Sequence, residues 1–271
     1  MRRVILSRKG FDSSAGGKAS PIFIDDRIFS LPIPQREESP TKYEDLYFNG
    51  ITGSEALREA SVKKVNESDF CHYDPALNDE IGIFGQAGNA QGELRNSGVD
   101  LGDLFLFFGW FKQYASRGRE SHQIFGWLQI SEMVKGGEDI KKYLDSRNIK
   151  HPHGYGDISR YRNNTLYIGS KNLTIGKKTT SLKGHGLFKN SVEDLILSSS
   201  QHTKSMWKLP KKYFKQSFND KEGLFINRRF LTDKNNFLVN TNTGHWQEAV
   251  LDCKNNPKVI GWAINLISKY G

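Results

Sequence analysis

The sequence predicts an α+β fold, built as a single domain around a small mixed β-barrel with helices at its periphery. The strongest observation is a pair of apolar segments, residues 104–111 and 122–130, joined by a polar loop that contains Gly118. Apolar side chains fall on both faces of the first segment, so a strand there must be covered on both sides, as in a barrel with helices packed outside it. A second observation is that segments with helical spacing of apolar residues lie on either side of this pair.

The residues before this hairpin are predicted to form short elements. The predicted strand and extended segments are residues 3–7 and 21–34, and the predicted helices are residues 43–46, 54–65 and 89–96. Ser54 is the expected N-cap of the second helix, and Gly98 is expected to end the third.

The residues after the hairpin are predicted to return to short strands and then to end in helices. The predicted strands are residues 164–169 and 184–187, and residues 193–197 form a short buried segment. Residues 246–253 are predicted to be helical, and Pro257 is expected at the first position of a final amphipathic helix.

Positive charge is concentrated in the second half of the chain. Residues 1–135 contain 16 Lys and Arg against 19 Asp and Glu, whereas residues 136–271 contain 23 against 11. The excess is densest between Lys141 and Lys215. This asymmetry favours a polyanionic partner, because Lys and Arg that neutralise phosphates release counterions. A solvated basic surface is the alternative.

Domain organisation and compartment follow from simple features. No internal repeat or clean linker divides the chain, so we expect one domain over residues 1–271, with a core around 84–135 and a basic elaboration around 141–215. The two cysteines, Cys71 and Cys253, lie far apart, which indicates free thiols and a cytoplasmic protein. No apolar run approaches the roughly 20 residues that span a bilayer, so no membrane partner is expected.

The hairpin and the residues before it resemble a known superfamily. A short helix (Glu93-Leu94-Arg95-Asn96), a Gly102-Asp103 turn, an apolar strand and a second strand with Gly126 follow one another in that order. This series is similar to the PUA-like superfamily, particularly its EVE and ASCH groups. The resemblance implies a PUA-like barrel that handles nucleic-acid bases.

A second resemblance covers nearly the whole chain. It rests on several strings: Leu6 to Ser13 with Gly16-Gly17, Ser20-Pro21-Ile22, Leu31-Pro32-Ile33-Pro34, Cys71-His72-Tyr73-Asp74-Pro75, Phe84 to Gly92, Phe107 to Phe111 and His151-Pro152-His153. These strings resemble the nucleotide-modification-associated domain family, third type, of bacteria and phages. The resemblance implies a context of DNA base hypermodification, with DNA or a nucleotide as partner and other base-modification enzymes as further partners. It implies no particular reaction.

The segment after the first strand is the first candidate site. Its cations and hydroxyl groups are suited to phosphate, and they are Arg8, Lys9, Ser13 and Lys18. Asp12 is available as a general base or a ribose contact. The glycine spacing fits neither a Walker A loop nor a dinucleotide fingerprint. A flexible solvated loop is the alternative.

Two further segments carry candidate side chains for acid–base chemistry and base recognition. His72 and Asp74 are an imidazole and a carboxylate that could transfer protons near neutral pH, although neighbours in a loop need not touch. The amide side chains that could bind base edges are Gln86, Asn89, Gln91 and Asn96, and the aromatic side chains that could stack on a base are Trp110 and Trp127. Helix capping and core packing are the alternatives.

His151 and His153 are additional pocket candidates. A His-x-His string can place two imidazoles on one metal ion, but two ligands do not make a site, and no third carboxylate or cysteine cluster lies at a telling spacing. We therefore expect no metal, and the sequence indicates no particular cofactor.

The sequence thus favours a nucleic-acid- or nucleotide-handling protein associated with DNA base modification. An enzyme, or an accessory subunit of one, is the leading hypothesis, because three polar segments are more than binding alone requires. The alternative is a non-catalytic reader of modified bases in DNA or RNA.

Overall fold

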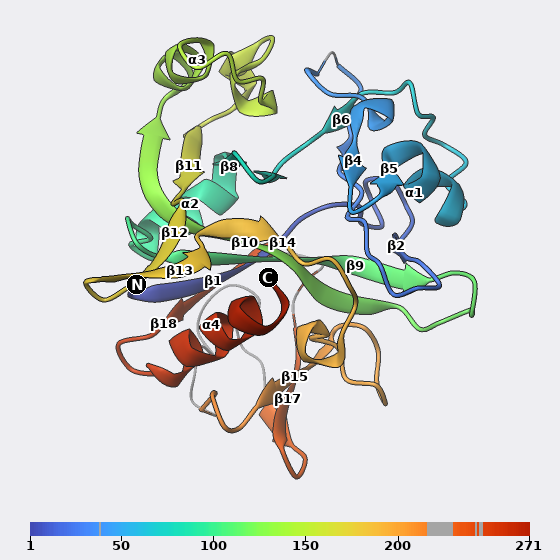
Figure 1. Ribbon diagram of the computed structural model, residues 1–271, viewed down its shortest axis with the longest axis vertical. Coiled ribbons are helices and arrows are strands. Elements are labelled where there is room, and N and C mark those ends of the chain that lie inside the picture. Colours follow the sequence, from blue (N-terminus) through green and yellow to red (C-terminus); the bar gives the residue numbers. More distant parts are fainter. Residues whose placement is uncertain (38, 216–229, 242, 244–245) are drawn as a thin grey trace.

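A mixed sheet forms the centre of the computed structural model, which describes all residues except 38, 216–229, 242 and 244–245 (Figure 1). Its strand order is β18 (Glu248–Asp252), β1 (Arg3–Arg8), β9 (Leu104–Gln113), β10 (Ser121–Lys135), β11 (Thr165–Gly169), β8 (Gly82–Gln86) and β7 (Ala76–Leu77). Two further strands extend it: β14 (His185–Leu187) pairs with β10, and β2 (Ser20–Ile22) pairs with β9. β1 and β2 run parallel to β9, whereas the other pairs are antiparallel.

The predicted hairpin is confirmed as β9 and β10, and both strands are longer than predicted. The side chains of β9 divide between two cores, with Leu104, Leu106 and Phe108 in one and Phe105, Phe107 and Phe111 in the other. A bulge between Ile124 and Gly126 of β10 shifts the alternation, so that Ile124 and Trp127 face the same core. The burial of both faces is therefore as expected.

The α+β class is confirmed, but the described strands form no closed barrel. β18 pairs only with β1 and β7 pairs only with β8, so the sheet has two separate edges. The long β10 strand pairs first with β9, up to Gln129, and then with β11 from Ile130 onward. This change of partner carries β11 and β8 out of the plane of the hairpin, where Figure 1 shows them rising above the rest of the sheet. The predicted PUA-like barrel is not confirmed.

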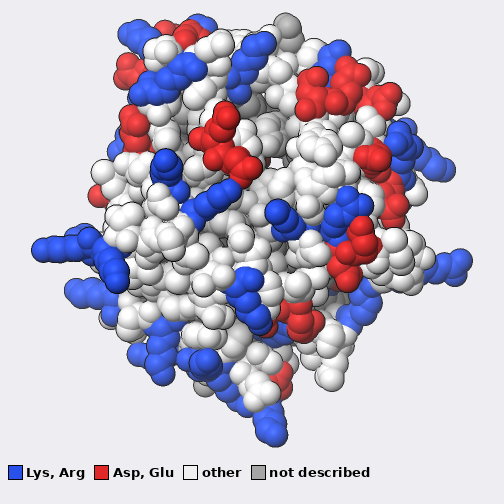
Figure 2. Space-filling model, in the orientation of Figure 1, with Lys and Arg blue, Asp and Glu red and all other residues white. Residues whose placement is uncertain are grey.

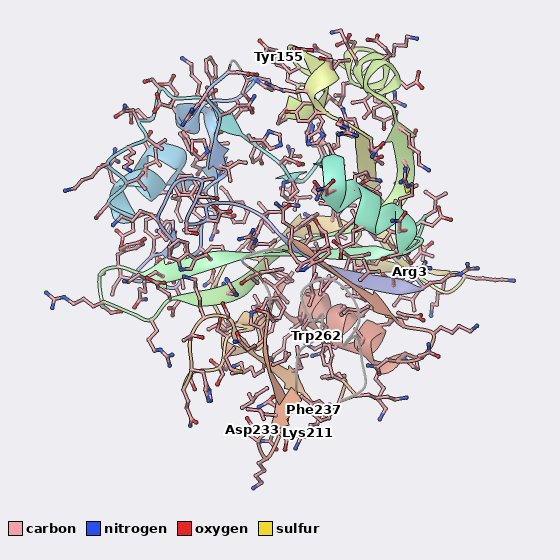
Figure 3. The ribbon with its side chains drawn as sticks, turned by 180° about the vertical axis from the view of Figure 1, so that it is seen from behind. Arg3, Tyr155, Lys211, Asp233, Phe237 and Trp262 are labelled. Atoms are coloured by element: carbon pink, nitrogen blue, oxygen red, sulfur yellow. The ribbon has the colours of Figure 1, made fainter. Side chains whose placement is uncertain are left out.

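The described part of the chain contains four α-helices, which lie in different parts of the fold. They are α1 (Gly53–Glu59), α2 (Gly88–Asn96), α3 (Gly137–Asp145) and α4 (Lys258–Tyr270). α4 covers the lower face in Figure 1, and its Trp262, labelled in Figure 3, packs edge-on against Phe214. The part of the chain that the structure describes has no helix long and apolar enough to cross a membrane.

Two lobes rise from the upper face of the sheet (Figure 1). One, which we call the α1 lobe, contains α1, β3 (Ile33–Pro34), β4 (Tyr47–Phe48), β5 (Ile51–Thr52) and β6 (Cys71–His72), and it has a core of its own around Tyr43 and Leu57. The other, the α3 lobe, contains α3, β8, β11 and residues 149–164, with a small core around Ile140 and Leu144. The space-filling view shows the surface hollowed between these lobes (Figure 2).

Smaller elements complete the fold. They are β12 (Asn172–Ile175) with β13 (Lys178–Lys183); β15 (Met206–Pro210), β17 (Asn236–Asn240) and β16 (Phe230–Thr232); and the 3-10 helices η1 (Tyr43–Asp45), η2 (Pro152–Gly154), η3 (Ile158–Arg160) and η4 (Glu193–Leu195). Cys71 and Cys253 are buried and unpaired, as predicted.

Two predicted details are wrong. Within residues 246–253 the structure has the strand β18, because Glu248 to Leu251 are buried along their whole run and pair with β1. The cap of α1 is Thr52, whose side chain accepts a hydrogen bond from the backbone of Glu55 in a capping box, and not Ser54. Pro257 precedes the final helix as its N-cap residue.

Candidate active site

The side chain of Asp74 lies at the seam between the two lobes and is almost completely buried. Asp74 follows β6 in the loop that leads to β7. Its Oδ1 accepts a hydrogen bond from the backbone N–H of Gly85 in β8 at 2.9 Å. Three imidazoles surround the carboxylate: Nε2 of His151 lies 3.2 Å from Oδ1, and Nε2 of His153 and His72 lie 3.6 and 3.8 Å from Oδ2. We call these four residues the Asp74 centre.

The two lobes contribute different histidines to the centre. His72 belongs to β6 of the α1 lobe and pairs with Ile33 of β3. His151 and His153 come from η2 and the residue before it, in the α3 lobe. Gly85 allows this approach, since a Cβ on it would lie 2.3 Å from the ring of His153. The sequence prediction named all four residues of the centre, but it did not predict that they lie close together in the fold.

Neighbouring groups determine which ring nitrogen of each histidine carries the proton. The Nδ1 of His153 lies 2.6 Å from Oδ1 of Asn164, whose amide nitrogen in turn donates to the carbonyl of His153. The Nδ1 of His72 lies 3.1 Å from Oε1 of Gln35. Both Nδ1 atoms therefore face acceptors and carry the proton of the neutral ring.

His151 has the opposite tautomer. Its Nδ1 accepts a hydrogen bond from the backbone N–H of His153 at 3.3 Å, so its Nε2 carries the proton and points toward Asp74. Its Nε2 lies 3.2 Å from Oδ1 of Asp74, and this contact lowers the pKa of the carboxyl. His151 is thus a donor toward Oδ1, whereas His72 and His153 present lone pairs to Oδ2.

Burial controls the charge of the centre. It lowers the pKa of His72 to about 3 and that of His153 to about 4, although the carboxylate of Asp74 opposes this shift. Burial raises the pKa of Asp74, but contact with the imidazoles outweighs this effect, so the pKa stays below its usual value. At neutral pH the rings of His72 and His153 are therefore neutral and lie beside the carboxylate anion of Asp74.

A second polar cluster lies next to the centre. Glu248 of β18 is completely buried, and its Oε1 accepts hydrogen bonds from Ser7, Lys9 and Gln86 at 3.1, 3.2 and 2.7 Å. The Nζ of Lys9 lies 4.7 Å above the ring of Phe84, and its charge also lowers the pKa of His72 and His153. The sequence prediction missed Glu248 because residues 246–253 were interpreted as a helix.

Aromatic and charged side chains cover the outer side of His153. The ring of Tyr161 stacks on it at 4.4 Å, and the guanidinium of Arg160 lies 4.9 Å from the ring of Tyr161. Arg160 forms an ion pair with Glu37, which links the α3 lobe to the α1 lobe. The Nε and Nη2 of Arg160 are buried and have no hydrogen-bond partner among the described residues.

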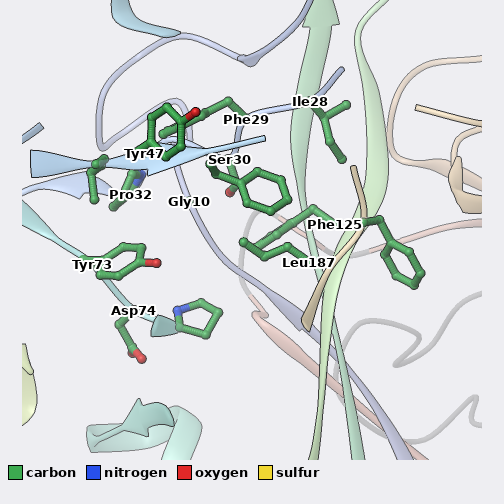
Figure 4. Close-up of a pocket in the computed structure, with 14 residues that line it drawn as sticks. Gly10, Ile28, Phe29, Ser30, Pro32, Tyr47, Tyr73, Asp74, Phe125 and Leu187 are labelled. Carbon is green, nitrogen blue, oxygen red and sulfur yellow. The ribbon is translucent and has the colours of Figure 1, made fainter. Parts of the chain in front are cut away.

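Two hollows adjoin the centre. One, of about 550 Å³, is lined in part by Gln91, Tyr161, Asn164 and Tyr167; it includes the two residues that contact His153 but none of the four residues of the Asp74 centre. The other, of about 50 Å³, has aromatic walls; Figure 4 shows Tyr73 beside it and the carboxylate of Asp74 pointing away from it. The larger hollow therefore has the volume for a nucleotide beside the centre.

The structure does not bring the predicted phosphate-binding residues together. Lys9 faces the centre, but Arg8 points to the other face of β1 and lies 3.6 Å from Asp12. Asp12 is engaged in a local turn with Ser14 and Ala15, outside the Asp74 centre. Ser13 and Lys18 are exposed.

The predicted base-binding residues are also dispersed. Gln86 contacts Glu248, and Gln91 accepts a hydrogen bond from Tyr167 at 2.9 Å, so both lie near the centre. Asn89 and Asn96 are on the exposed face of α2. Trp127 is buried in the core against Phe188, with its indole N–H on the carbonyl of Lys183, and Trp110 lies under Lys204 and donates to Glu120.

Comparison of the sequence with models of known protein families shows which family the chain belongs to. The model of nucleotide modification associated domain 3 matches residues 3–252. The chain belongs to this family. No curated protein and no solved structure matched it. The matched part of this nucleotide modification associated domain includes every residue of the Asp74 centre and the Glu248 cluster, so both belong to the domain itself.

Proposed function

We propose that this protein is an enzyme that modifies a nucleotide, or a nucleobase within DNA, and that the Asp74 centre is its active site. The observation that carries the proposal is the buried carboxylate of Asp74 within 3.8 Å of three imidazoles contributed by two lobes. Family membership supplies the association with nucleotide modification.

A purely structural role accounts poorly for this arrangement. Burying an ionised carboxylate costs several kcal/mol unless hydrogen bonds compensate, and among the described residues Asp74 is approached only by the backbone N–H of Gly85 and the ring N–H of His151 as donors. Clusters of titratable groups with strongly shifted pKa values occur preferentially at functional sites. A carboxylate within 3.8 Å of three imidazoles offers a bound substrate several groups that can accept a hydrogen bond or a proton from it.

The hollow lined by Gln91, Tyr161, Asn164 and Tyr167 is the proposed substrate pocket. Its amide and phenol groups can bind the edge and the face of a base. Arg160 is a further candidate for phosphate binding, because its Nε and Nη2 form the edge that takes an oxyanion with two hydrogen bonds; both atoms are buried, so a phosphate reaches them only if the side chain moves. Lys9 adds positive charge on the other side of the centre.

The charge distribution supports DNA as the polymeric partner. In Figure 2 acidic and basic side chains are mixed over the two upper lobes, whereas Lys and Arg predominate over the lower half of the molecule. The basic surface could bind the phosphate backbone in a salt-dependent way, and other base-modification enzymes are further proposed partners. The alternative, a non-catalytic reader of modified bases, is an outcome of the following experiment.

The test compares the nucleosides of DNA and of the nucleotide pool from cells that express the chain, its Asp74→Asn variant or its His202→Ala variant. His202 is exposed and lies in a turn near β15, so it serves as the matched control. We expect a new nucleoside mass with the wild type and the control, and a loss of at least about 100-fold with Asp74→Asn. A folded Asp74→Asn protein that produces the same nucleoside would refute the active site. Selective binding to modified DNA without any product would favour the reader.

A further inference from the structure

The three atoms that face one another in the Asp74 centre are all electron-pair donors. They are Nε2 of His72, Nε2 of His153 and Oδ2 of Asp74; the carboxylate oxygen lies 3.8 and 3.6 Å from the two nitrogens, and ligand atoms of the three residues lie within 4.8 Å of one another. We propose that these three atoms bind a divalent transition-metal ion. This inference adds a cofactor to the centre and rests on the proposed function only for its catalytic meaning.

The positions of the ring protons of His72 and His153 leave both Nε2 atoms able to bind a metal ion. The Nδ1–H groups of His72 and His153 are directed to Gln35 and Asn164, which leaves both Nε2 lone pairs pointing toward the carboxylate. Metal-binding histidines commonly donate their other ring N–H to a neighbouring oxygen, which fixes the tautomer and the ring orientation. In this protein the side-chain oxygens of Gln35 and Asn164 are the acceptors of these ring N–H groups.

Without a cation, this arrangement is repulsive. The Nε2 lone pairs of His72 and His153 lie 3.8 and 3.6 Å from Oδ2 of Asp74, and the side chains of His72, Asp74 and His153 are 18%, 4% and 4% exposed. A divalent cation between the three atoms would remove this repulsion, because it can accept an electron pair from each of them.

The distances are close to those of a metal site. With metal–nitrogen bonds of about 2.1 Å, neighbouring ligand atoms of one ion lie about 3.0 to 3.4 Å apart. The contacts from Oδ2 of Asp74 to the two Nε2 atoms are 3.6 and 3.8 Å, so sub-ångström movements bring both into range. The sequence prediction of no metal rested on two histidines alone, whereas the fold adds a carboxylate and a third imidazole.

His151 and Gly85 have a different role in this proposal. Nε2–H of His151 and N–H of Gly85 both face Oδ1, which directs the other carboxylate oxygen toward the ion. His151 is therefore a positioning residue. Three protein ligands leave coordination positions for water or substrate, and a set of two imidazoles and one carboxylate suits iron(II), manganese(II), cobalt(II) or zinc(II) better than magnesium.

The experiment measures metal uptake directly. The purified full-length chain is stripped with a chelator and titrated with zinc(II), manganese(II), anaerobic iron(II) and magnesium(II) in equilibrium dialysis, and cobalt(II) binding is followed by its visible spectrum. We expect one transition-metal ion per chain and no comparable binding of magnesium. Asp74→Asn and His153→Ala should abolish stoichiometric uptake, while His151→Gln should keep the stoichiometry and lower affinity by about 10- to 100-fold.

The exposed His202 provides the control, because His202→Ala should bind like the wild type. Absence of stoichiometric uptake by the folded wild type, or uptake that Asp74→Asn and His153→Ala leave unchanged, would overturn the metal site. If a variant fails to fold, the ligand-field spectrum of the cobalt(II) wild type decides, since it must show imidazole and carboxylate coordination. If nucleotide modification persists without metal, the proposed enzymatic function is supported and the catalytic role of the metal is rejected. If the protein binds metal but modifies no nucleotide, the metal site is supported and the enzymatic function is rejected.

Discussion

Two groups of buried histidines in this protein differ in what their lone pairs face. In the core below the sheet, His122 of β10 is 3% exposed, and its Nδ1 accepts a hydrogen bond from the indole N–H of Trp207 at 3.0 Å. In the Asp74 centre, His72 and His153 are also largely buried, but their Nε2 atoms face a carboxylate oxygen. Burial lowers the pKa of His122 to about 3, close to the values of His72 and His153.

The comparison shows that a shifted histidine pKa does not by itself mark a functional site. Desolvation shifts all three rings in the same direction. What differs is complementarity: the lone pair of His122 has a donor, and the ring lies edge-on to Phe108 as an ordinary core side chain. The Asp74 centre lacks such a donor among the described residues, which is why we assign function there.

The largest expected contrast is in stability. His122→Ala removes a buried ring and leaves the indole N–H of Trp207 without its acceptor, so we expect a loss of about 3 kcal/mol in the free energy of unfolding. Asp74→Asn in the metal-free protein removes a buried charge at nearly constant volume and should cost less than about 1 kcal/mol. Urea unfolding with a chelator present measures both. Equal losses in the two variants would contradict the distinction between a satisfied and an unsatisfied histidine site.

The next effect concerns pH. The pKa of His122 in the folded protein is about 3, below the value of about 6.5 in an unfolded chain, so the unfolded state binds the proton first. Its contribution to stability is complete above pH 6.5 and is lost as the pH falls toward 3, by about 2 kcal/mol at pH 5. Lys204 and Arg8 act in the same direction as burial.

The measurement is the unfolding free energy of the wild type and of His122→Gln between pH 7.5 and pH 5. The variant should lose less stability over this range, because glutamine can keep an acceptor near Trp207 and does not titrate. Parallel pH profiles for the two proteins would show that His122 is not responsible.

Sequence patterns predicted the part of the fold that depends on local periodicity. Apolar residues on both faces of residues 104–111 predicted a strand covered on both sides, and Leu104 and Phe105 do lie in different cores. The pattern failed at β18, where a buried Glu248 interrupts an apolar run and hides the strand. Its partners Ser7, Lys9 and Gln86 come from distant segments, which no local pattern reports.

The sequence prediction identified the residues of the candidate site individually, but it did not predict that their side chains lie together. His72 and Asp74 are near each other in sequence, as are His151 and His153, but their convergence depends on β8 passing between the two segments with Gly85 at the contact. The amide residues could have been separated by helical spacing: Gln91 and Leu94 share the buried face of α2, whereas Asn89 and Asn96 lie on its exposed face. The barrel was not predictable from the hairpin, because closure depends on which strands occupy the edges.

The smallest expected effect concerns the ion pair that connects the lobes. Glu37 is largely exposed, and exposed ion pairs contribute little to stability, so Glu37→Gln should change the free energy of unfolding by no more than about 0.5 kcal/mol. Arg160→Gln should have an equally small effect on stability but should raise KM for the nucleotide substrate several-fold with little change in kcat, because it removes a proposed phosphate contact and no reacting group. Steady-state kinetics of the two variants measure this difference. If Glu37→Gln and Arg160→Gln raise KM equally, the ion pair between the lobes is what supports substrate binding. A phosphate contact by Nε and Nη2 of Arg160 would then be rejected.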